Sequence, residues 1–288
     1  MIKYSFIIPH RNTPDLLERC VKSIPQRDDI EIIVVDDNSD EDKKPTISRE
    51  GVIIILLDAT QSKGAGRARN VGMRRAQGKW LLFADADDFY KKGFLNFLDD
   101  LVNSKNDAIY FSADSVKSDT LEPYMRTRSL QLAIKEFDGS EQAASLIKYK
   151  HHTPWNKMVS ADFILKYGIQ FEEVEQGNDT MFSYMVGYFA KNIKVIPMDL
   201  YTYTYNENSI TTREKNMAHY HCGVLNYFKQ AKFLRFVGKP EYALSPIQYL
   251  ARCYRQYGFE GLMKIVYIMF TSQKEIRLQS TKYIKIVQ

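Results

Sequence analysis

Hydrophobic runs and amphipathic segments alternate along the first 113 residues of the chain. The runs are continuous in Ile, Val, Leu and aromatic residues, as in strands that are buried on both faces of a parallel sheet. The segments between them repeat apolar residues every three or four positions, as one face of a helix does. This alternation predicts an α/β fold with a mixed, mainly parallel sheet flanked by helices. It predicts strands over residues 4–9, 31–36, 52–57, 79–84 and 107–112, and helices over 14–24, 64–77 and 93–104.

The pattern becomes less regular after residue 113 and turns helical towards the end of the chain. Two further strands are predicted at 193–197 and 200–205. From about residue 213 onwards, Tyr, Phe, Lys and Arg recur at helical spacing. We therefore expect one domain over residues 1–212, with halves over 1–113 and 114–212, and a helical C-terminal extension over 213–288.

An apolar stripe marks the helical extension, with Glu260 and Lys264 on the opposite side of the same helix. We interpret the stripe as a face that docks against the main domain. The alternative is a peripheral membrane contact, supported by the basic residues that follow. The stripe consists of Phe259, Leu262, Met263, Val266 and Phe270, and the basic residues are Lys274, Arg277, Lys282 and Lys285.

Composition and charge limit the classes of function. The 40 Lys and Arg residues exceed the 35 Asp and Glu residues by only five, which is too few to indicate a nucleic-acid-binding groove. Cys20, Cys222 and Cys253 are scattered and show no disulfide or zinc pattern, so we expect a reducing compartment. We see no secretory signal and no run of 18 apolar residues. The predicted location is the cytoplasm, with the inner face of the cell membrane as a peripheral alternative.

Three carboxylates, Asp85, Asp87 and Asp88, follow the apolar run of residues 79–84. Carboxylates this close raise one another's pKa and repel, so the site needs a compensating charge. A divalent cation is the usual compensation, and Mg²⁺ typically takes one or two carboxylates together with substrate phosphates. The alternative is a set of surface acids that cap the next helix. We predict a site for a metal ion and a diphosphate.

Polar residues also follow the first two predicted strands. In parallel sheets, ligands bind beyond the carboxyl ends of the strands, so clusters at several strand ends would form one cleft. Asp40 or Ser39 could instead cap a helix, although capping does not explain the paired carboxylates. The first strand ends in Pro9, His10, Arg11 and Asn12, and the second in Asp36, Asp37, Asn38, Ser39 and Asp40.

A basic, glycine-containing segment lies between the third and fourth of these strands. Gly64 and Gly66 permit close approach to the backbone at a helix start, where free N–H groups favour anions. Lys63 precedes these glycines, and Arg69 lies one turn into the helix, where it could reach a phosphate or a base. Arg74 and Arg75 are interpreted as a solvated helix face.

A second group of signals lies between residues 150 and 180. His151 to Lys157 are polar and aromatic, unlike a core strand. Acidic residues then precede an amphipathic helix, where Asn178 or Asp179 could be a helix cap or a catalytic group. These acids are Glu172, Glu173, Glu175 and Asp179.

Over residues 4–212 the ordered motifs resemble the family 2 glycosyltransferases, which have the nucleotide-sugar-binding GT-A fold. The match rests on the order and spacing of several motifs together. These are FIIPHRN from residue 6, VVDDNSD from 34, KGAGRARNVGMRRAQGKWLLFADADD from 63, WNK from 155, Asn178-Asp179 and Asn208-Ser209-Ile210-Thr211. This chain has Asn178 where the family has a glutamate before the aspartate.

The resemblance implies a role for each matched residue. Asp179 would be the general base that deprotonates the acceptor hydroxyl. Asp85 and Asp87 would be metal ligands, with Asp87 the principal one. Donor contacts would come from Pro9, Arg11, Asn12, Asp36, Asp37, Lys63, Gly66, Arg69, Asp85 and Ala86. The acceptor or donor-sugar side would include Asp88, Trp155, Asn156, Lys157 and Asn178.

The resemblance also implies the reaction and its partners. The chain would move a sugar, with inversion, from a nucleotide diphosphate donor such as a UDP-sugar to a glycan or lipid-linked glycan. The cofactor would be Mn²⁺ or Mg²⁺, and the role would be surface polysaccharide synthesis. Two alternatives stay open. One is a Mg²⁺-dependent phosphoryl-transfer enzyme, and the other is a non-catalytic module that binds sugar nucleotides or glycans.

Overall fold

The structure is a computed structural model that describes residues 1–174, 177–206 and 216–287. Within these residues one eight-stranded sheet runs through the molecule in the order β3-β2-β1-β4-β7-β6-β8-β5. The strands are β1 (Tyr4–His10), β2 (Ile30–Asp37), β3 (Val52–Leu57), β4 (Trp80–Phe83), β5 (Phe89–Tyr90), β6 (Ala108–Lys117), β7 (Lys157–Ser160) and β8 (Ile193–Tyr205).

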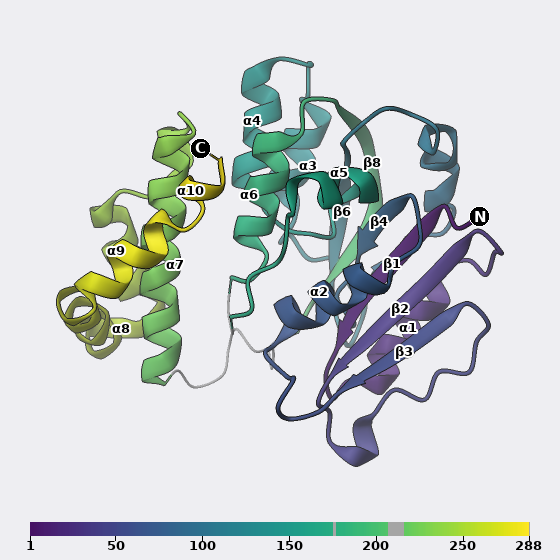
Figure 1. The fold of residues 1–288 in the computed structure, drawn as a ribbon, viewed down its shortest axis with the longest axis horizontal. Coiled ribbons are helices and arrows are strands. Elements are labelled where there is room, and N and C mark those ends of the chain that lie inside the picture. The colour runs from purple at the N-terminus through teal and green to yellow at the C-terminus, as the bar shows by residue number, and fades with distance from the viewer. Residues whose placement is uncertain (175–176, 207–215, 288) are drawn as a thin grey trace.

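Helices cover both faces of the sheet (Figure 1). The α-helices are α1 (Pro14–Ser23), α2 (Ala65–Arg75), α3 (Arg128–Lys135), α4 (Glu141–Lys150), α5 (Ala161–Tyr167), α6 (Thr180–Phe189), α7 (Met217–Phe236), α8 (Pro246–Thr271), α9 (Gln273–Thr281) and α10 (Ile284–Val287). Short 3₁₀ helices are η1 (Glu41–Lys43), η2 (Phe94–Phe97), η3 (Asp99–Leu101) and η4 (Pro240–Tyr242).

The amino-terminal half of the sheet is parallel, as the sequence predicted. β1 lies between β2 and β4 and pairs in parallel with both, while β3 extends the sheet beyond β2. Alternate residues of β2 face opposite sides, so Ile33 and Val35 pack with Ala68 of α2 while Ile32 and Val34 join the main core with α1. The carboxyl ends of β1, β2 and β4 therefore meet at one edge.

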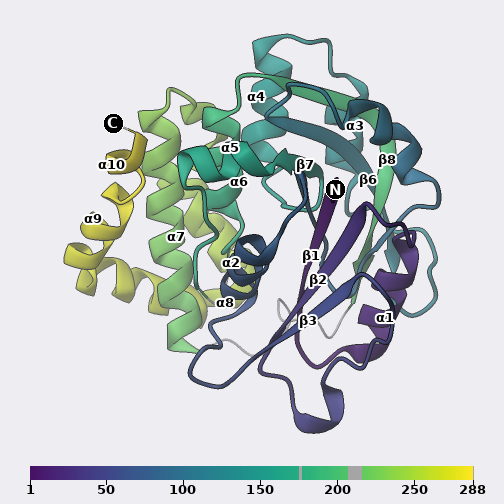
Figure 2. The same cartoon turned by 45° about the vertical axis from the view of Figure 1, so that its right-hand side comes forward.

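The other half of the sheet mixes directions. β7 is inserted between β4 and β6 and is antiparallel to both, whereas β6 and β8 are parallel. Figure 2 shows this half covered by α3 to α6. Neither the four-residue β7 nor the two-residue β5 was predicted, because strands this short carry too little periodicity to be recognised.

Two elements predicted for this half have a different secondary structure or extent in the structure. The helix predicted over residues 93–104 is instead the pair of 3₁₀ helices η2 and η3. Gly93, at φ 79°, begins this segment, and Phe94 stacks on Tyr90 with ring centroids 4.5 Å apart. The two strands predicted between 193 and 205 are one strand, β8, whose register with β6 shifts around Ser112.

The C-terminal helices build a second apolar cluster. Tyr220 and Val224 of α7 pack there with Ile265 and Ile268 of α8. α7 also reaches the main core, because its Phe233 stacks against α6. In both views α7 lies between α6 and α9 (Figures 1 and 2). The boundary predicted between residues 212 and 213 lies outside the described residues.

The predicted docking stripe does not face the main domain. Phe259, Met263 and Phe270 are 69%, 49% and 76% exposed, while α8 buries the neighbouring face that carries Ile265 and Ile268. That segment of α8 has two apolar faces, and the aliphatic one packs against α7, where Gly261 makes room for Tyr257 of the same helix and lies near the Tyr220 hydroxyl. Among the described residues, no helix is long and apolar enough to cross a membrane.

Candidate active site

The end of β1 is tied to the end of β2 by buried hydrogen bonds. His10 Nδ1 lies 2.7 Å from Asp36 Oδ1, and His10 Nε2 accepts the N–H of Thr13 at 3.1 Å. These two partners fix the ring in the tautomer that carries its proton on Nδ1. Asp36 also accepts the N–H and the hydroxyl of Ser39. Asp36 is 1% exposed, and its carboxylate is used in hydrogen bonds that hold this loop.

The loops that follow β1 and β2 are locked together at the carboxyl edge of the sheet. Asn12, at φ 59°, donates its side-chain amide to Asp40 and accepts the N–H of Asp40 at 2.8 Å. Asparagine tolerates this left-handed conformation better than most residues. Pro9 is buried within β1, whereas the side chain of Arg11 is 58% exposed and lies 3.9 Å from Asp37. Asn12 and Arg11 therefore lie at the rim.

Asp37 positions the start of α2. Its carboxylate accepts the backbone N–H groups of Lys63 (3.2 Å) and Gly64 (2.9 Å). The side chain of Lys63 is 57% exposed and lies 3.8 Å from Glu173. The basic, glycine-containing segment is thus joined to the acidic end of β2.

Gly66 has a different neighbour from the one expected. A Cβ at this position would lie 1.9 Å from the carbonyl oxygen of Glu172 and 2.9 Å from Cβ of Asn178. The close approach is thus made by the protein's own backbone, at the segment that leads into α6. Glycine is required here because α2 and this segment are in direct contact.

Arg69 connects the two sides of the site. Its guanidinium donates to Asp85 Oδ1 at the end of β4 and to Asn178 Oδ1 at 2.8 Å, and it lies over the ring of Phe171 at 5.3 Å. The residue is 5% exposed, and its Nε has no hydrogen-bond partner among the described residues. A buried guanidinium with a spare donor beside a carboxylate is suited to binding an anion.

The three carboxylates after β4 are not equivalent. Asp88 is fully buried and accepts the hydroxyl of Tyr201 at 2.8 Å and the N–H of Thr204 at 2.7 Å. Burial, followed by the charges of Asp87 and Asp85, raises the pKa of Asp88 well above its ordinary value. Asp88 therefore anchors the loop to β8 and does not face the cleft, contrary to the expectation for this residue.

Asp85 and Asp87 are left as the accessible pair. The Asp85 side chain is 34% exposed, and its backbone N–H is held by the Tyr201 hydroxyl at 3.0 Å. Burial and the charge of Asp85 raise the pKa of Asp87 to about 6. Ala86, between the two, is 8% exposed. Asp85 and Asp87 thus concentrate negative charge at the end of β4, where a cation would be stabilised.

Asp179 lies at the first position before α6. Its backbone has φ −90° and ψ −26°, and its side chain makes no capping hydrogen bond. Helix capping therefore does not account for this carboxylate. Lys157 and His152 lie close enough for the charge of Asp179 to raise their pKa values, although burial lowers both more strongly, that of Lys157 to about 7.

The WNK segment lies beneath the site and not on its surface. Trp155 is 6% exposed and stacks on Tyr201, with ring centroids 5.1 Å apart and an interplanar angle of 8°. Asn156 and Lys157 are fully buried, and Lys157 Nζ donates to the Thr153 carbonyl and to the Ser183 hydroxyl. These three residues support the site from beneath through Tyr201, Thr153 and Ser183.

Several residues of the site were not predicted. Tyr201 and Thr204 of β8 bind the acidic loop, and Arg19 of α1 donates to the Asp87 carbonyl at 2.6 Å. The alternation of Thr and Tyr over residues 201–205 was the available signal for β8. Arg19 and Phe171 carry no local sequence signal. The predicted Glu175 and residues 208–211 lie outside the described residues.

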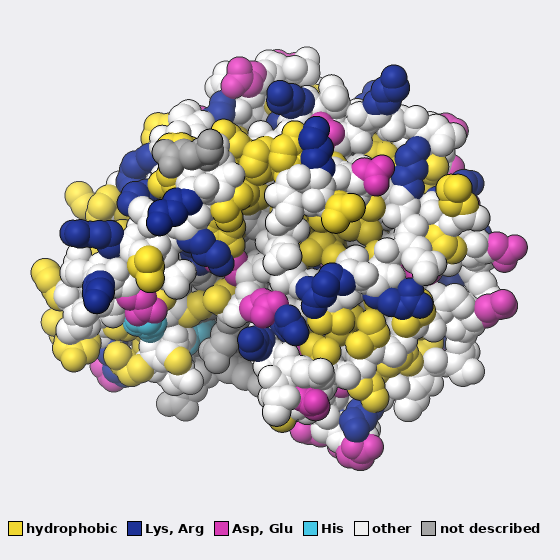
Figure 3. All heavy atoms as spheres, viewed as in Figure 1, with side chains coloured by type: hydrophobic (Ala, Val, Ile, Leu, Met, Phe, Trp, Pro, Cys, Tyr) yellow, Lys and Arg dark blue, Asp and Glu magenta, His cyan; other side chains and the backbone are white. Residues whose placement is uncertain are grey.

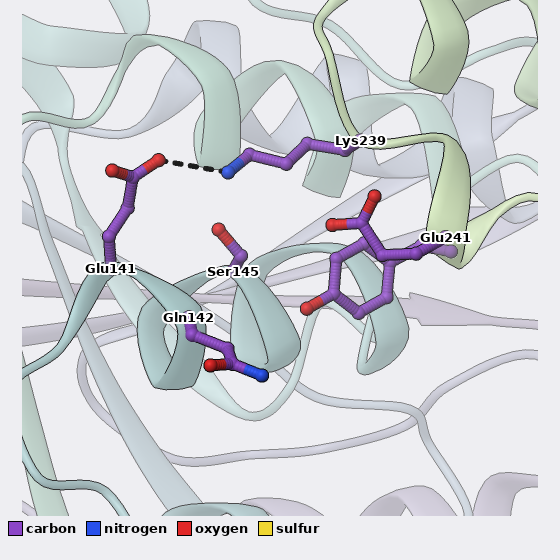
Figure 4. Close-up of a pocket in the computed structure, with 6 residues that line it drawn as sticks. Glu141, Gln142, Ser145, Lys239 and Glu241 are labelled. Carbon is purple, nitrogen blue, oxygen red and sulfur yellow. Dashed lines mark hydrogen bonds and ion pairs between the residues drawn. The ribbon is translucent and has the colours of Figure 1, made fainter.

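A surface hollow lies elsewhere, between α4 and η4 (Figure 4). Lys239 and Glu141 form an ion pair across it at 2.9 Å, but the side chain of Glu141 is 88% exposed, so this pair contributes little. The hollow contains none of the strand-end residues. Its lining is Glu141, Gln142, Ser145, Lys239, Glu241 and Tyr242.

Comparison with known proteins decides the family of the chain. The sequence model of the family described as Glycosyl transferase family 2 matches residues 5–165, which is more than half of the chain. The chain is a family 2 glycosyltransferase. This assignment favours the glycosyltransferase over the phosphoryl-transfer interpretation of the acidic strand ends.

Relatives of this glycosyltransferase come from several bacteria. EpsH of Bacillus subtilis, which is named as a glycosyltransferase, is 24% identical over 253 residues, covering 82% of this chain and 70% of EpsH. The GalNAc(5)-diNAcBac-PP-undecaprenol beta-1,3-glucosyltransferase of Campylobacter jejuni is 36% identical over 104 residues, about a third of each chain.

The fold of the glycosyltransferase is that of solved relatives. The crystal structure of Staphylococcus aureus TarS residues 1–349 in complex with UDP-GlcNAc has a TM-score of 0.65 to this chain at 17% identity. The match covers 93% of this chain and 79% of that one. The chain therefore has the GT-A fold, with a mixed, mainly parallel sheet and C-terminal helices.

Proposed function

We propose that this enzyme transfers a sugar, with inversion, from a UDP-sugar to a hydroxyl of a glycan or lipid-linked glycan in surface polysaccharide synthesis. Two of the solved TarS structures that share its fold are complexes, one with UDP-GlcNAc and one with UDP. The Campylobacter and Staphylococcus relatives are named for lipid-linked glycan and poly(ribitol-phosphate) substrates. The observation that carries the proposal is Arg69, which joins the acidic end of β4 to the segment before Asp179.

The donor diphosphate would lie against Arg69 and the Asp85–Asp87 pair. Arg69 has a spare N–H in a buried position, and hydrogen bonds to charged partners are stronger than neutral ones. Arg11 and Lys63, both exposed at the rim, add positive charge on the side of β1 and α2. Asp36 and Asp37 would act indirectly, by fixing the loops that contact the nucleotide.

The residues at the end of β4 fit a hard divalent cation. Asp85 and Asp87 offer carboxylate oxygens, and burial, followed by the charge of Asp85, raises the pKa of Asp87, a shift that a nearby cation would oppose. Among the described residues no cluster of three His, Cys, Asp or Glu could hold a metal by itself. Two carboxylates are what Mg²⁺ or Mn²⁺ needs when phosphates supply further oxygens. When bound, such an ion would neutralise charge on the leaving diphosphate.

Asp179 would take the proton from the acceptor hydroxyl. The bond from the acceptor oxygen to the anomeric carbon forms while the bond from that carbon to the diphosphate oxygen breaks. The proton passes to Asp179, and the nucleoside diphosphate leaves with the electron pair. Attack from the face opposite the leaving group gives inversion. The uncapped position of Asp179 at the start of α6 leaves its carboxylate free for this role.

Asn178 would position the base and not share its proton. Its amide oxygen accepts from Arg69, so Asn178 links the segment before α6 to the donor side through one hydrogen bond. A glutamate at this position would place a second negative charge beside Asp85. The amide therefore suits a site in which Arg69 is already paired with Asp85.

The test is release of UDP from a panel of UDP-sugars, with Mn²⁺ and with extracts of candidate glycans as acceptors. We expect turnover with one donor, loss of turnover in Asp87→Ala, and loss of turnover with donor binding retained in Asp179→Asn. Normal turnover in Asp179→Asn would refute the assignment of the base. Phosphate release without sugar transfer would refute the proposed reaction.

A further inference from the structure

The outer face of α8 exposes large apolar side chains along one line. Phe259, Met263, Tyr267 and Phe270 are 69%, 49%, 63% and 76% exposed. At 100° per residue, their spacing places all four within an arc of about 80° on the helix surface. We call these four residues the α8 stripe. An isolated exposed apolar residue is normal, but a continuous stripe of four marks a contact surface.

The α8 stripe is not packed against any described part of the chain. The same helix buries Gly261, Ile265 and Ile268 against α7, so the stripe lies on the side turned away from the protein. Helix α9, which follows, adds Leu278 at 66% exposure. In Figure 3, apolar side chains project from the left margin of the molecule, where α8 and α9 lie in Figure 1.

The C-terminal segment that contains the stripe carries all the excess positive charge of the protein. Residues 246–288 contain seven Lys and Arg residues against two Asp and Glu residues, a net charge of +5 that equals that of the whole chain. Six of the seven are exposed: Arg252, Arg255, Lys274, Arg277, Lys282 and Lys285. Both acids have basic partners, since Glu260 pairs with Lys264 and Glu275 lies 3.0 Å from His221.

We propose that the outer face of α8, with the adjoining basic residues of α8 to α10, docks on an anionic lipid membrane. An exposed apolar stripe on a helix with Lys and Arg beside it is the pattern of helices that lie in a membrane interface. Aromatic rings and methionine suit that depth, and tyrosine adds a polar end for the headgroup region. Basic residues near a negatively charged leaflet add attraction that salt weakens.

Charge favours a membrane over a second copy of the chain. Two copies meeting through this face would bring two segments of net charge +5 together, and like charges at an interface oppose association. An anionic lipid surface complements the same charge. Residues 1–245 carry a balanced charge and provide no such attraction.

The test is co-sedimentation of the full chain with vesicles of phosphatidylcholine, with and without phosphatidylglycerol. We expect at least about tenfold stronger binding to the phosphatidylglycerol vesicles, falling as salt is raised. The stripe variant, Phe259→Ser with Met263→Ser, Tyr267→Ser and Phe270→Ser, should lose at least about tenfold in vesicle binding.

Two further variants separate the stripe from general surface effects. A control with Leu132→Ser, Leu165→Ser and Met198→Ser removes exposed apolar residues of the main domain and should bind vesicles like the wild type. Replacement of Arg255, Lys274, Arg277 and Lys285 by glutamine should remove the preference for phosphatidylglycerol. All these side chains are exposed, so thermal unfolding should stay unchanged in every variant.

A fluorescence experiment places the stripe at the lipid surface directly. The two native tryptophans, Trp80 and Trp155, are 1% and 6% exposed, so a Phe259→Trp variant adds the one indole open to solvent among the described residues. Its emission should shift to shorter wavelength when phosphatidylglycerol vesicles are added. No shift would contradict insertion of this face.

Three results would overturn the proposal. The first is absence of binding to either vesicle, and the second is unchanged binding by the stripe variant. The third is a dimer in sedimentation equilibrium that the stripe substitutions disperse, which would assign the face to a second copy. The proposal does not depend on sugar transfer, because UDP binding is measured separately and should be equal in the wild type and the stripe variant.

Discussion

The carboxyl edge of the sheet and the outer face of α8 depart from the usual distribution of side chains in opposite directions. The sheet edge buries polar and charged side chains, whereas the outer face of α8 exposes aromatic ones. At the sheet edge, His10, Arg69 and Asp88 are polar or charged and almost completely buried. On α8, Phe259 and Phe270 are aromatic and more than two-thirds exposed. Each region inverts the usual distribution of polar and apolar residues.

Burying polar groups and exposing apolar ones are both unfavourable for folding. The two regions differ in which groups compensate for this. At the sheet edge the buried His10, Asp36 and Asp88 have hydrogen-bond partners among the described residues, whereas Arg69 Nε has none and burial raises the pKa of Asp87 to about 6. On α8 the described residues offer the stripe no partner, and the proposed partner is a lipid surface. The first region is therefore interpreted as a site for a small ligand, and the second as a surface for a large one.

The largest effect is expected from Asp179→Asn. Removing a general base lowers turnover by about 100- to 10,000-fold, while donor binding, which uses the other side of the cleft, should stay the same. UDP release and calorimetric UDP binding would be measured on the same protein. The matched control is Asp162→Asn, an exposed acid in the first turn of α5, which should leave both quantities unchanged.

Lys229→Met should destabilise the fold more than any substitution at the sheet edge or on the α8 stripe. Lys229 of α7 and Glu172 form an ion pair of 2.6 Å in which each side chain is 4% exposed. Leaving one buried charge without its partner costs about 3–5 kcal/mol, so urea unfolding should occur at much lower denaturant. The double variant Lys229→Met with Glu172→Leu should recover much of this loss.

The control for that substitution is an exposed pair. Lys22 and Glu18 of α1 lie 2.7 Å apart with side chains 72% and 55% exposed, so Lys22→Met should cost less than about 1 kcal/mol. Equal destabilisation by Lys22→Met and Lys229→Met would contradict the claim that α7 is bound to the segment before α6 by a buried pair.

Substitutions on the two faces of α8 should differ sharply. Ile265 is 1% exposed, and Ile265→Ala should cost about 2–4 kcal/mol because it leaves a cavity against α7. Phe259→Ser, on the exposed face, should change the free energy of unfolding by less than about 0.5 kcal/mol. Similar losses for both, measured by urea unfolding, would show that the stripe is packed against the protein.

Asp87→Asn should stabilise the fold in a pH-dependent way. The pKa of Asp87 is raised from 3.8 to about 6, so the folded state favours the neutral form, and stability falls as pH rises through this window. Above pH 6 the free energy of unfolding of Asp87→Asn, measured by urea unfolding, should exceed that of the wild type by up to about 3 kcal/mol. Below pH 3.8 the two proteins should be equally stable.

Much of the fold was predictable because its signals are local. β1, β2 and β3 are continuous apolar strands, and the alternation with α1 and α2 predicts their parallel pairing. The common edge for the strand ends followed from that topology alone. The residues that hold the edge together were not predictable, because Tyr201 lies 113 positions from Asp88 in the chain.

The roles within a motif were harder to predict than the motif itself. Asp85, Asp87 and Asp88 look equivalent in the sequence, and burial under β8 is what removes Asp88 from the cleft. Gly66 suggested an approaching ligand, whereas the structure brings Glu172 to it. On α8 two apolar faces compete, and only the packing of Ile265 and Ile268 with α7 shows which one is buried.

Calorimetric titration with UDP, GDP, dTDP and CMP, each with and without Mn²⁺, tests the central claim most directly. Wild type and Asp87→Ala would be compared at a pH well above 6, where the Asp87 carboxylate is ionised. The account predicts Mn²⁺-dependent binding of UDP that Asp87→Ala loses. Binding of no nucleotide, or equal binding by both proteins, would contradict a donor site at the carboxyl end of β4.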